Sequence, residues 1–332
     1  MAPTRHGDPT FTAGTDTDPR MTIVLDAQRL RVDYGRFTAL SDFSLQLSAG
    51  HLLGLIGPNG AGKTTCLKAM CGIVPVTAGR VTILGDELTL TDPLVRSRCG
   101  FAPDTPPVYD ELTVAQFLEF IGRAHRIRLD LINERIDFWL EQLWLHDRRN
   151  SKIKSLSRGM KQRLTVARTL LPDPPLVLLD EPAAGLDPAG RVAFRKMLAS
   201  LRDQGKALIV SSHILADLHE YCTHIGIMQG GRMIQFGTVA QVVGAKEDNR
   251  CRWEVTLARQ IPDVAGAIGA IPGLTALEVH GRQVSFEYEH DDQAAADLLA
   301  KFLESGLPVA RFAPVEHDLE QAYLRTGIRQ VD

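Results

Sequence analysis

Apolar and polar residues alternate or cluster over strand-length stretches in the first part of the chain. Such stretches cover residues 23–30, 40–47 and 51–56, with turn-forming glycines between them. Stretches of this kind predict β-strands. After the third stretch, a Gly-rich turn leads into apolar positions at helical spacing over 63–71, and another strand pair is expected to end near Gly85. The chain therefore begins with β-structure that passes through a loop into a helix.

Residues 92–163 change to a helical pattern. Thr113 followed by Gln116 predicts a capping box, and the segments 113–128 and 130–145 carry apolar residues at helical spacing. We interpret this region as an inserted helical subdomain.

Helices and strands alternate in the next part of the chain. A helix is expected at about 157–170, a buried strand at 176–179, a helix at about 189–204 and a strand at 207–211. This alternation predicts a parallel sheet.

The end of the chain predicts a second, smaller domain. The expected elements are strand 251–258, helix 262–271, strand 274–280, strand 283–289, helix 291–305, strand 307–314 and helix 316–326. A βαββαβ order is typical of a ferredoxin-like fold. With a polar linker at 244–249, we expect a disordered tail over 1–20, an α/β domain over 21–244 and an α+β domain over 250–332.

The composition is that of an ordinary globular protein. The 332 residues carry a formal net charge of −3, so no general basic field draws the chain to nucleic acid or an anionic membrane. The scattered cysteines form no C-x-x-C pair and suggest neither a disulfide framework nor a zinc site, which fits a reducing cytoplasm. No apolar run approaches the roughly 18 to 20 residues that a membrane-spanning helix needs. Residues 1–20 lack the apolar centre of a signal peptide, and Met21 is an alternative start.

A phosphate-binding loop is predicted between the third strand and the first helix. The residues that match G-x-x-x-x-G-K-[ST] are Gly57, Pro58, Asn59, Gly60, Ala61, Gly62, Lys63 and Thr64. Glycines let successive backbone N–H groups curl around phosphate oxygens, and the helix N-terminus adds partial positive charge. In this arrangement Lys63 reaches the outer phosphates and Thr64 offers its hydroxyl to Mg²⁺. We include Thr65 among the expected nucleotide-binding residues.

A pair of carboxylates follows the buried strand 176–179. Asp180 and Glu181 stand at the C-terminal end of this strand, which places them beside the phosphate loop in a parallel sheet. We expect Asp180 to hold the Mg²⁺ shell and Glu181 to orient or deprotonate the attacking water. A solvated acidic turn at a strand end is the plain alternative.

A further motif narrows the class of phosphate-loop protein. A segment before an expected helix reads Leu156-Ser157-Arg158-Gly159-Met160-Lys161-Gln162. It resembles the LSGGQ signature of ATP-binding-cassette (ABC) transporters, and the resemblance covers about 21–240. It implies the ABC cassette fold of the P-loop NTPases, with a mixed sheet core and an inserted helical subdomain. The implied activity is that of an ATPase that uses ATP and Mg²⁺.

The resemblance also implies how the site works. In that family two cassettes form a head-to-tail dimer with two ATP molecules at the interface. Ser157 and the backbone of Gly159 would contact the γ-phosphate held by the partner, as suits a short side chain and a glycine at a helix N-terminus. Ser157 as a simple N-cap is the structural alternative, and both readings can hold together. The family pattern further assigns Tyr34 to adenine stacking, Asp187 to the loop that crosses the interface and His213 to sensing the γ-phosphate.

Departures from the family pattern put the rate of hydrolysis in question. The signature has Arg158 where Gly is usual and Met160 where Gln is usual. Asp104 stands in the loop after Cys99–Pro103 where Gln is usual, and we expect it to contact Mg²⁺ through a bound water. These features and the segment Glu316–Leu324 resemble bacterial exporter cassettes, which drive drug, polysaccharide or lipid export through a separate transmembrane subunit.

The exporter resemblance implies a peripheral protein on the cytoplasmic face of the cell membrane. The helical insert would dock onto the membrane subunit, and the cassette would pair with a second copy or with another cassette. A non-transport ABC ATPase that acts on a macromolecular complex is the alternative, disfavoured by the single cassette without a coiled-coil insertion or basic patch. A P-loop kinase or GTPase is a further alternative, and the signature at Leu156 to Gln162 argues against it because neither class needs that motif. The C-terminal domain carries none of these motifs and is expected to regulate the cassette or to help hold the dimer.

Overall fold

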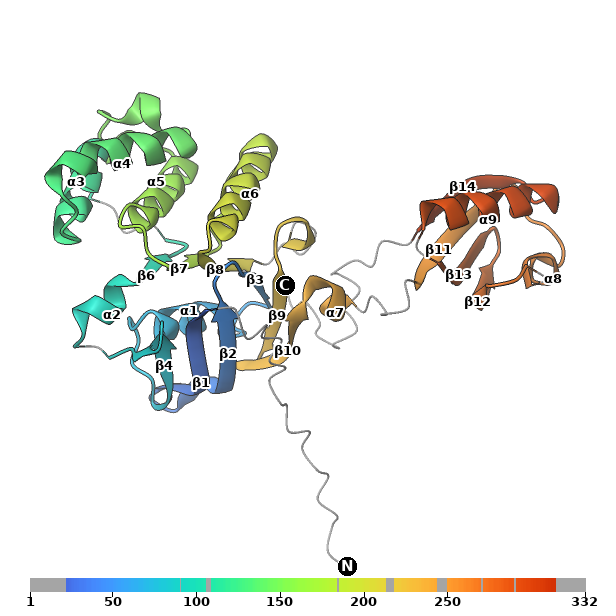
Figure 1. Cartoon of the computed structure of the whole chain (residues 1–332), viewed down its shortest axis with the longest axis horizontal. Coiled ribbons are helices and arrows are strands. Elements are labelled where there is room, and N and C mark those ends of the chain that lie inside the picture. The colour runs from blue at the N-terminus through green and yellow to red at the C-terminus, as the bar shows by residue number, and fades with distance from the viewer. Residues whose placement is uncertain are drawn as a thin grey trace, which may run out of the picture. The chain divides into compact units, whose positions relative to one another are not determined.

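The computed structural model describes residues 22–89, 91–105, 109–183, 185–212, 218–243, 250–269, 271–289 and 291–314. The chain divides after Thr238 into two compact units, whose elements are labelled in Figure 1. The expected linker at 244–249 lies outside the described residues.

An antiparallel sheet opens the first unit. Its strand order is β2-β1-β4-β5, with β1 at Ile23–Tyr34, β2 at Phe37–Ser48, β4 at Ala78–Ile83 and β5 at Asp86–Glu87. One face of this sheet packs on the core, because alternate residues such as Leu30 and Phe43 are fully buried.

A six-stranded sheet forms the centre of the first unit, in the order β10-β9-β3-β8-β7-β6. Its strands are β3 (Leu52–Ile56), β6 (Cys99–Ala102), β7 (Leu176–Asp180), β8 (Ala207–Ser212), β9 (His224–Gln229) and β10 (Arg232–Thr238). All pairings are parallel except that of β10 with β9. Every residue of β3 and β7 is buried, as expected of parallel strands covered on both faces. The carboxyl ends of β3, β7 and β8 meet at one edge of the sheet.

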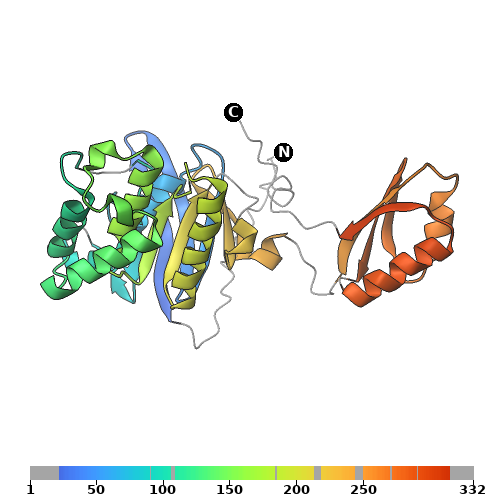
Figure 2. The same ribbon diagram turned by 90° about the horizontal axis from the view of Figure 1, so that it is seen from above.

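The helices of the first unit are α1 (Lys63–Met70), α2 (Pro93–Ser97), α3 (Val114–Ala124), α4 (Leu129–Gln142), α5 (Arg158–Leu170) and α6 (Pro188–Asp203). Short 3-10 turns lie at His146–Arg148, Ile153–Ser155 and Leu218–Glu220. Helices α3, α4 and α5 gather into one cluster in both views (Figures 1 and 2). The expected capping box is confirmed, since the Thr113 side chain accepts from the Gln116 backbone and the Gln116 side chain accepts from the Thr113 backbone.

The structure differs from the expected helical pattern at the start of 92–163. Residues Cys99–Ala102 form strand β6, which pairs in parallel with β7 in the central sheet. Its four residues are too few to show a period, and the strand is defined by its partner rather than by its own pattern. Strands β9 and β10 were likewise not expected as elements.

The second unit is a four-stranded antiparallel sheet with helices. Its elements are α7 (Val239–Val243), β11 (Arg250–Leu257), α8 (Val264–Gly269), β12 (Thr275–His280), β13 (Gln283–Glu289), α9 (Asp292–Glu304) and β14 (Val309–Pro314). The strand order is β12-β13-β11-β14. Val255, Phe286 and Phe302 belong to its own buried core. The expected α/β cassette with a small α+β domain is therefore confirmed, whereas the helix expected at 316–326 lies outside the described residues.

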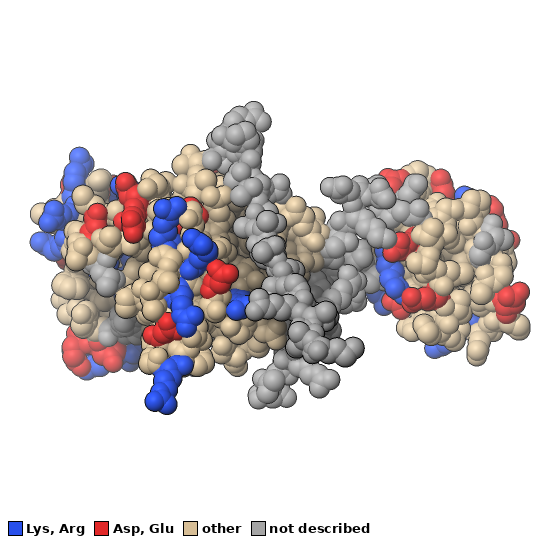
Figure 3. All heavy atoms as spheres, turned by 90° about the horizontal axis from the view of Figure 1, so that it is seen from below, with Lys and Arg blue, Asp and Glu red and all other residues tan. Residues whose placement is uncertain are grey.

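Two surface properties complete the fold. Among the described residues, the structure has no helix both long and apolar enough to span a bilayer. On the face of the first unit drawn in Figure 3, acidic and basic side chains are interspersed.

Candidate functional site

The predicted phosphate loop joins β3 to α1. Gly62 stands before the helix with a φ of 100°, and no side chain of the described residues caps the first turn. The backbone N–H groups at this end are therefore available to an anion. A Cβ at Gly62 would lie 2.8 Å from the Ala39 carbonyl oxygen, so both the conformation and the close approach of β2 require glycine.

Lys63 folds back onto its own loop. Its side chain is 8% exposed, and Nζ donates hydrogen bonds to the carbonyl oxygens of Gly57 at 2.6 Å and Pro58 at 3.2 Å. Burial lowers the pKa of the Lys63 ammonium, while the nearby Glu181 and Asp180 carboxylates act to raise it. The lysine thus lies within electrostatic reach of both predicted acidic residues.

Asp180 is the centre of a buried polar cluster. It is 2% exposed at the end of β7. Thr64 Oγ1 donates to its Oδ2 at 2.8 Å, and Ser211 Oγ donates to its Oδ1 at 2.6 Å. The strand order places β8 beside β7, with Ser211 directly across from Asp180. The solvated-turn alternative does not apply to Asp180, because both carboxylate oxygens are bonded inside the protein.

Ser211 is a site residue that the sequence interpretation missed. Its hydroxyl also accepts a hydrogen bond from the Glu181 backbone at 3.0 Å, so one side chain holds both predicted acidic residues. Glu181 has a φ of 48°, a left-handed conformation that costs a non-glycine residue on the order of 1 kcal/mol. The only sequence signal for Ser211 is its position near the end of an expected strand.

The oxygen groups of this cluster suit a magnesium ion. Thr64 and Asp180 bring a hydroxyl and a carboxylate together at the mouth of the phosphate loop. Mg²⁺ prefers oxygen ligands and usually binds through one or two protein groups with waters and substrate phosphates. The residues present therefore fit Mg²⁺ bound together with a nucleotide.

The signature segment forms the start of α5. Ser157 is the N-cap, and its Oγ accepts from the Met160 backbone at 3.2 Å. A Cβ at Gly159 would lie 2.7 Å from the Gly185 carbonyl oxygen, so a close approach within the chain already requires glycine here. The N-cap reading is confirmed, and contact of Ser157 and Gly159 with a partner's nucleotide stays a prediction.

Asp104 lies beside the signature helix. Its Oδ1 is 3.8 Å from Arg158 Nη2, and the two side chains are 45% and 79% exposed. Gln162 of α5 donates to the Pro103 carbonyl oxygen at 3.2 Å, which fastens the same loop to the helix. A contact of Asp104 with Mg²⁺ stays a prediction.

Of the remaining predicted residues, Tyr34 and Asp187 lie at the ends of two different elements. Tyr34 ends β1 and is 49% exposed, on the hairpin whose second strand reaches Gly62 through Ala39. Asp187 is the N-cap of α6, where its Oδ1 accepts from the Gly190 backbone at 2.7 Å. His213 lies outside the described residues.

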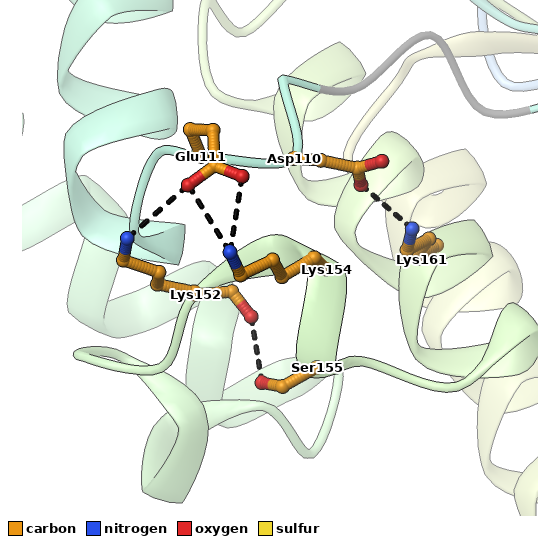
Figure 4. A network of polar contacts seen from close by, with 6 residues as sticks. All are labelled: Asp110, Glu111, Lys152, Lys154, Ser155 and Lys161. Atoms are coloured by element: carbon orange, nitrogen blue, oxygen red, sulfur yellow. Dashed lines mark hydrogen bonds and ion pairs between the residues drawn. The ribbon is translucent and has the colours of Figure 1, made fainter.

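Ion pairs join the segment after the Asp104 loop to the segment before the signature and to the signature helix α5 (Figure 4). Glu111 contacts Lys152 at 3.2 Å and Lys154 at 3.0 Å, and Asp110 contacts Lys161 of α5 at 2.7 Å. Exposed pairs each contribute about 0 to 1 kcal/mol, so these contacts add little to the stability of the fold.

Comparisons with known proteins agree with this geometry. A family model described as ABC transporter matches residues 40–184. The Nod factor export ATP-binding protein I of Cupriavidus pinatubonensis is 35% identical over 219 residues, which cover 66% of this chain and 67% of that protein. The uncharacterized ABC transporter ATP-binding protein YxlF of Bacillus subtilis is 31% identical over 303 residues, 91% of this chain and 99% of that protein. A solved ATP-binding subunit of an ABC transporter is 30% identical, with a TM-score of 0.63, over 67% of this chain and 92% of that one. The phosphate loop and the buried acidic cluster agree with these similarities. The chain therefore belongs to the ATP-binding subunits of the ABC transporter family and is an ATPase of that family.

Proposed function

We propose that this ATPase powers export through a separate transmembrane subunit. The observation that carries the ATP-hydrolysing part of the proposal is the cluster of Thr64, Asp180 and Ser211 beside the buried Lys63, which is arranged for a nucleotide phosphate. Relatives named for Nod factor export support the export direction. The site of action is the cytoplasmic face of the cell membrane, where the chain is a peripheral subunit.

Each residue of the site has a distinct task in hydrolysis. The phosphate loop, from Gly57 to Thr64 and on to Thr65, binds the phosphates, and Lys63 moves from its carbonyl partners to the outer phosphate oxygens. Thr64 and Asp180 would hold Mg²⁺, and the ion would supply positive charge against the negative charge that develops on the phosphates. Glu181 orients or deprotonates the water that attacks the γ-phosphorus, so that ATP and water give ADP and phosphate.

The complete site requires two cassettes. Ser157 and the Gly159 backbone of one cassette face the γ-phosphate bound by the other, while Tyr34 stacks on adenine and His213 senses the γ-phosphate. Asp187 lies in the loop at the interface. The exposure of Ser157 and Asp187 supports this placement. The second cassette is either another copy of this chain or a different cassette.

Replacing the proposed base tests the assignment. Glu181→Gln should lower ATP hydrolysis about a hundredfold or more, yet bind MgATP and accumulate as an ATP-bound dimer. Turnover and size-exclusion elution with ATP measure both effects, with Glu141→Gln on α4 as an exposed control. Near-normal turnover in the Glu181 variant would contradict the role.

Capture from detergent-solubilised membranes tests the transport role. A tagged chain should retain a multi-spanning membrane protein. Retention of ribosomes or DNA instead would favour a non-transport ATPase.

A further inference from the structure

One buried hydroxyl joins the two strands at the acidic end of the site. Ser211 is fully buried near the end of β8, and the parallel register of β7 with β8 places it directly across from Asp180. Asp180 in turn accepts a hydrogen bond from Thr64 of the phosphate loop. The Ser211 hydroxyl therefore lies at the edge of the sheet where hydrolysis is proposed to occur.

The two hydrogen bonds of this hydroxyl have fixed directions. The Glu181 backbone N–H can only donate, so Ser211 Oγ accepts from it at 3.0 Å. The hydroxyl proton is then available to Asp180, whose Oδ1 accepts it at 2.6 Å. Because one oxygen atom makes both bonds, the two acidic residues together fix the rotation of the Ser211 hydroxyl.

The backbone of Glu181 is the part of the site that needs support. Its φ of 48° lies in the left-handed region, which a residue with a side chain keeps only when the surrounding structure holds it there. Ser211 holds this backbone through the N–H. Since the direction of a side chain follows from the backbone that carries it, the same bond sets where the Glu181 carboxylate points.

In this conformation the Glu181 carboxylate lies close to the phosphate loop. Burial lowers the pKa of the Lys63 ammonium, and the charges of the Glu181 and Asp180 carboxylates counteract this effect. The proposed base is therefore within electrostatic reach of the residue that is proposed to bind the outer phosphates. A different backbone conformation at Glu181 would carry its carboxylate elsewhere.

We infer that Ser211 is a positioning residue for ATP hydrolysis, whose hydroxyl keeps Glu181 in the conformation that directs its carboxylate to the attacking water. This inference rests on the proposed function, in which Glu181 is the base, and adds a residue that acts through Glu181. Asp180 has a second task here, because its bond to the hydroxyl proton keeps an oxygen lone pair turned toward the Glu181 N–H.

Removing the hydroxyl should slow turnover but spare nucleotide binding. In the full-length chain, Ser211→Ala should lower kcat about tenfold to a hundredfold, as expected for a misplaced catalytic group. The dissociation constant for MgATP should stay within about threefold, because the phosphate loop is unchanged. ATPase assays and calorimetric titration measure the two effects. An unchanged kcat would overturn the inference.

A second variant covers the case in which the alanine variant does not fold. Ser211→Cys keeps a side chain of similar shape with a weaker hydrogen-bonding group, and its kcat should lie between those of the unaltered chain and Ser211→Ala. If Ser211→Ala does not bind MgATP, the cysteine variant takes its place in every comparison. Loss of MgATP binding in both variants would make Ser211 a structural residue and overturn the inference.

Thr223→Val is the matched control, because Thr223 makes a similar pair of bonds at the opposite ends of the same strands. Its Oγ1 accepts from the Leu52 backbone N–H at 2.9 Å and donates to the Leu52 carbonyl oxygen at 3.1 Å. This variant should lower the midpoint of thermal unfolding and keep kcat within about twofold. A kcat that falls as far as in Ser211→Ala would mean that lost stability, rather than lost position, slows turnover, and the inference would fail.

A double-variant cycle distinguishes positioning of Glu181 from a general structural role. Single-turnover hydrolysis of radiolabelled ATP is measured for Glu181→Gln with and without Ser211→Ala. If Ser211 acts through Glu181, its replacement should change the residual rate of Glu181→Gln by less than about twofold, because residues that act as a unit have non-additive effects. An equal fall with and without the Glu181 carboxylate would contradict the inference.

The outcomes separate this inference from the proposed function. If Glu181→Gln hydrolyses ATP at a near-normal rate, the proposed role of Glu181 fails and the inference fails with it. If Glu181→Gln is slow and the effects of the two substitutions are additive, only the inference fails.

Discussion

At the scale of single residues, the side chain of Lys63 is held in the phosphate loop by contacts that do not need a nucleotide. Its ammonium group is bonded to two carbonyl oxygens of the phosphate loop and lies near two carboxylates. A buried cation needs such partners, and phosphate oxygens can replace the carbonyl oxygens with stronger charge-assisted bonds. The loop therefore keeps the lysine in place without a nucleotide.

Removing this cation should weaken ATP binding. We expect Lys63→Ala to lower the affinity for ATP about tenfold or more, since a hydrogen bond to a charged group contributes about 1.5 to 3 kcal/mol. Equilibrium binding of a fluorescent ATP analogue measures the loss. Lys68→Ala, on the same helix, is the control and should bind normally. Tight ATP binding without Lys63 would count against the site.

Asp104 lies near Arg158 in the structure and is predicted to contact Mg²⁺ through a bound water. Substitutions can show which of these two contacts matters for hydrolysis. If Asp104 serves Mg²⁺, Asp104→Gln should retain ATPase activity, while Asp104→Ala should weaken both the magnesium dependence and the stimulation by the membrane subunit. The assay is ATPase activity against Mg²⁺ concentration, with and without that subunit.

Arg158→Ala is the matched control for Asp104. The ion pair is long and exposed, so its loss should change stability by less than about 1 kcal/mol. If Arg158→Ala reproduces the effects of Asp104→Ala, the aspartate acts through the arginine. An Asp104→Ala variant with unchanged magnesium dependence and full stimulation would make it a plain solvated residue.

At the scale of elements, the central sheet brings a half-buried and a buried histidine together at the start of its strands. The ring centroids of His51, before β3, and His224, on β9, are 4.2 Å apart, and His224 stacks on Phe236 at 5.7 Å. Parallel pairing of β3 with β9 sets this contact. Burial lowers the pKa of the His51 imidazole below its usual 6.5.

This histidine should make stability depend on pH. The unfolded chain takes up the His51 proton near pH 6.5 and the folded chain only at lower pH. Above pH 6.5 this histidine therefore does not lower the free energy of unfolding. As the pH falls below 6.5, the unfolded chain is protonated first and the free energy of unfolding decreases. Urea midpoints between about pH 5 and pH 8 should fall on acidification, and less steeply for His51→Gln. Equal slopes for both proteins would contradict the prediction. His125, whose pKa is also lowered, adds to the slope in both.

At the scale of the whole molecule, two units with separate cores are joined after Thr238. Every described residue of the candidate site belongs to the first unit. The sheet, α8 and α9 of the second unit contain none of the described residues of the candidate site, and a regulatory or dimer-holding role for this unit stays a prediction.

Truncation tests this division of labour. A chain that ends at Gly244 keeps the core of the first unit and should bind ATP with an affinity within about twofold of the full chain, because the described residues of the site all lie before that point. Calorimetric titration with ATP and thermal unfolding measure binding and folding. A truncated chain that folds but does not bind nucleotide would show that the second unit completes the site.

The phosphate loop and the signature were predictable because their chemistry depends on residues adjacent in the chain. The positive φ of Gly62, the N-cap of Ser157 and the capping box of Thr113 are local, and a local pattern specifies them. Long periodic helices and the buried strands β3, β7 and β8 were predictable for the same reason, whereas the buried strand β9 was not. Strand β6, with four residues, was not.

Tertiary structure decided which distant residues meet. Ser211 bonds Asp180 because β8 lies beside β7 in a particular register, and a sequence does not state strand order. Arg126 and Arg168, which lie 42 positions apart in the sequence, line one groove because α3 packs near α5. By itself the sequence determined the kinds of chemistry in this protein, since each motif is a short run of residues. The fold alone determined their partners, because contacts across a sheet or between helices depend on how separate elements pack.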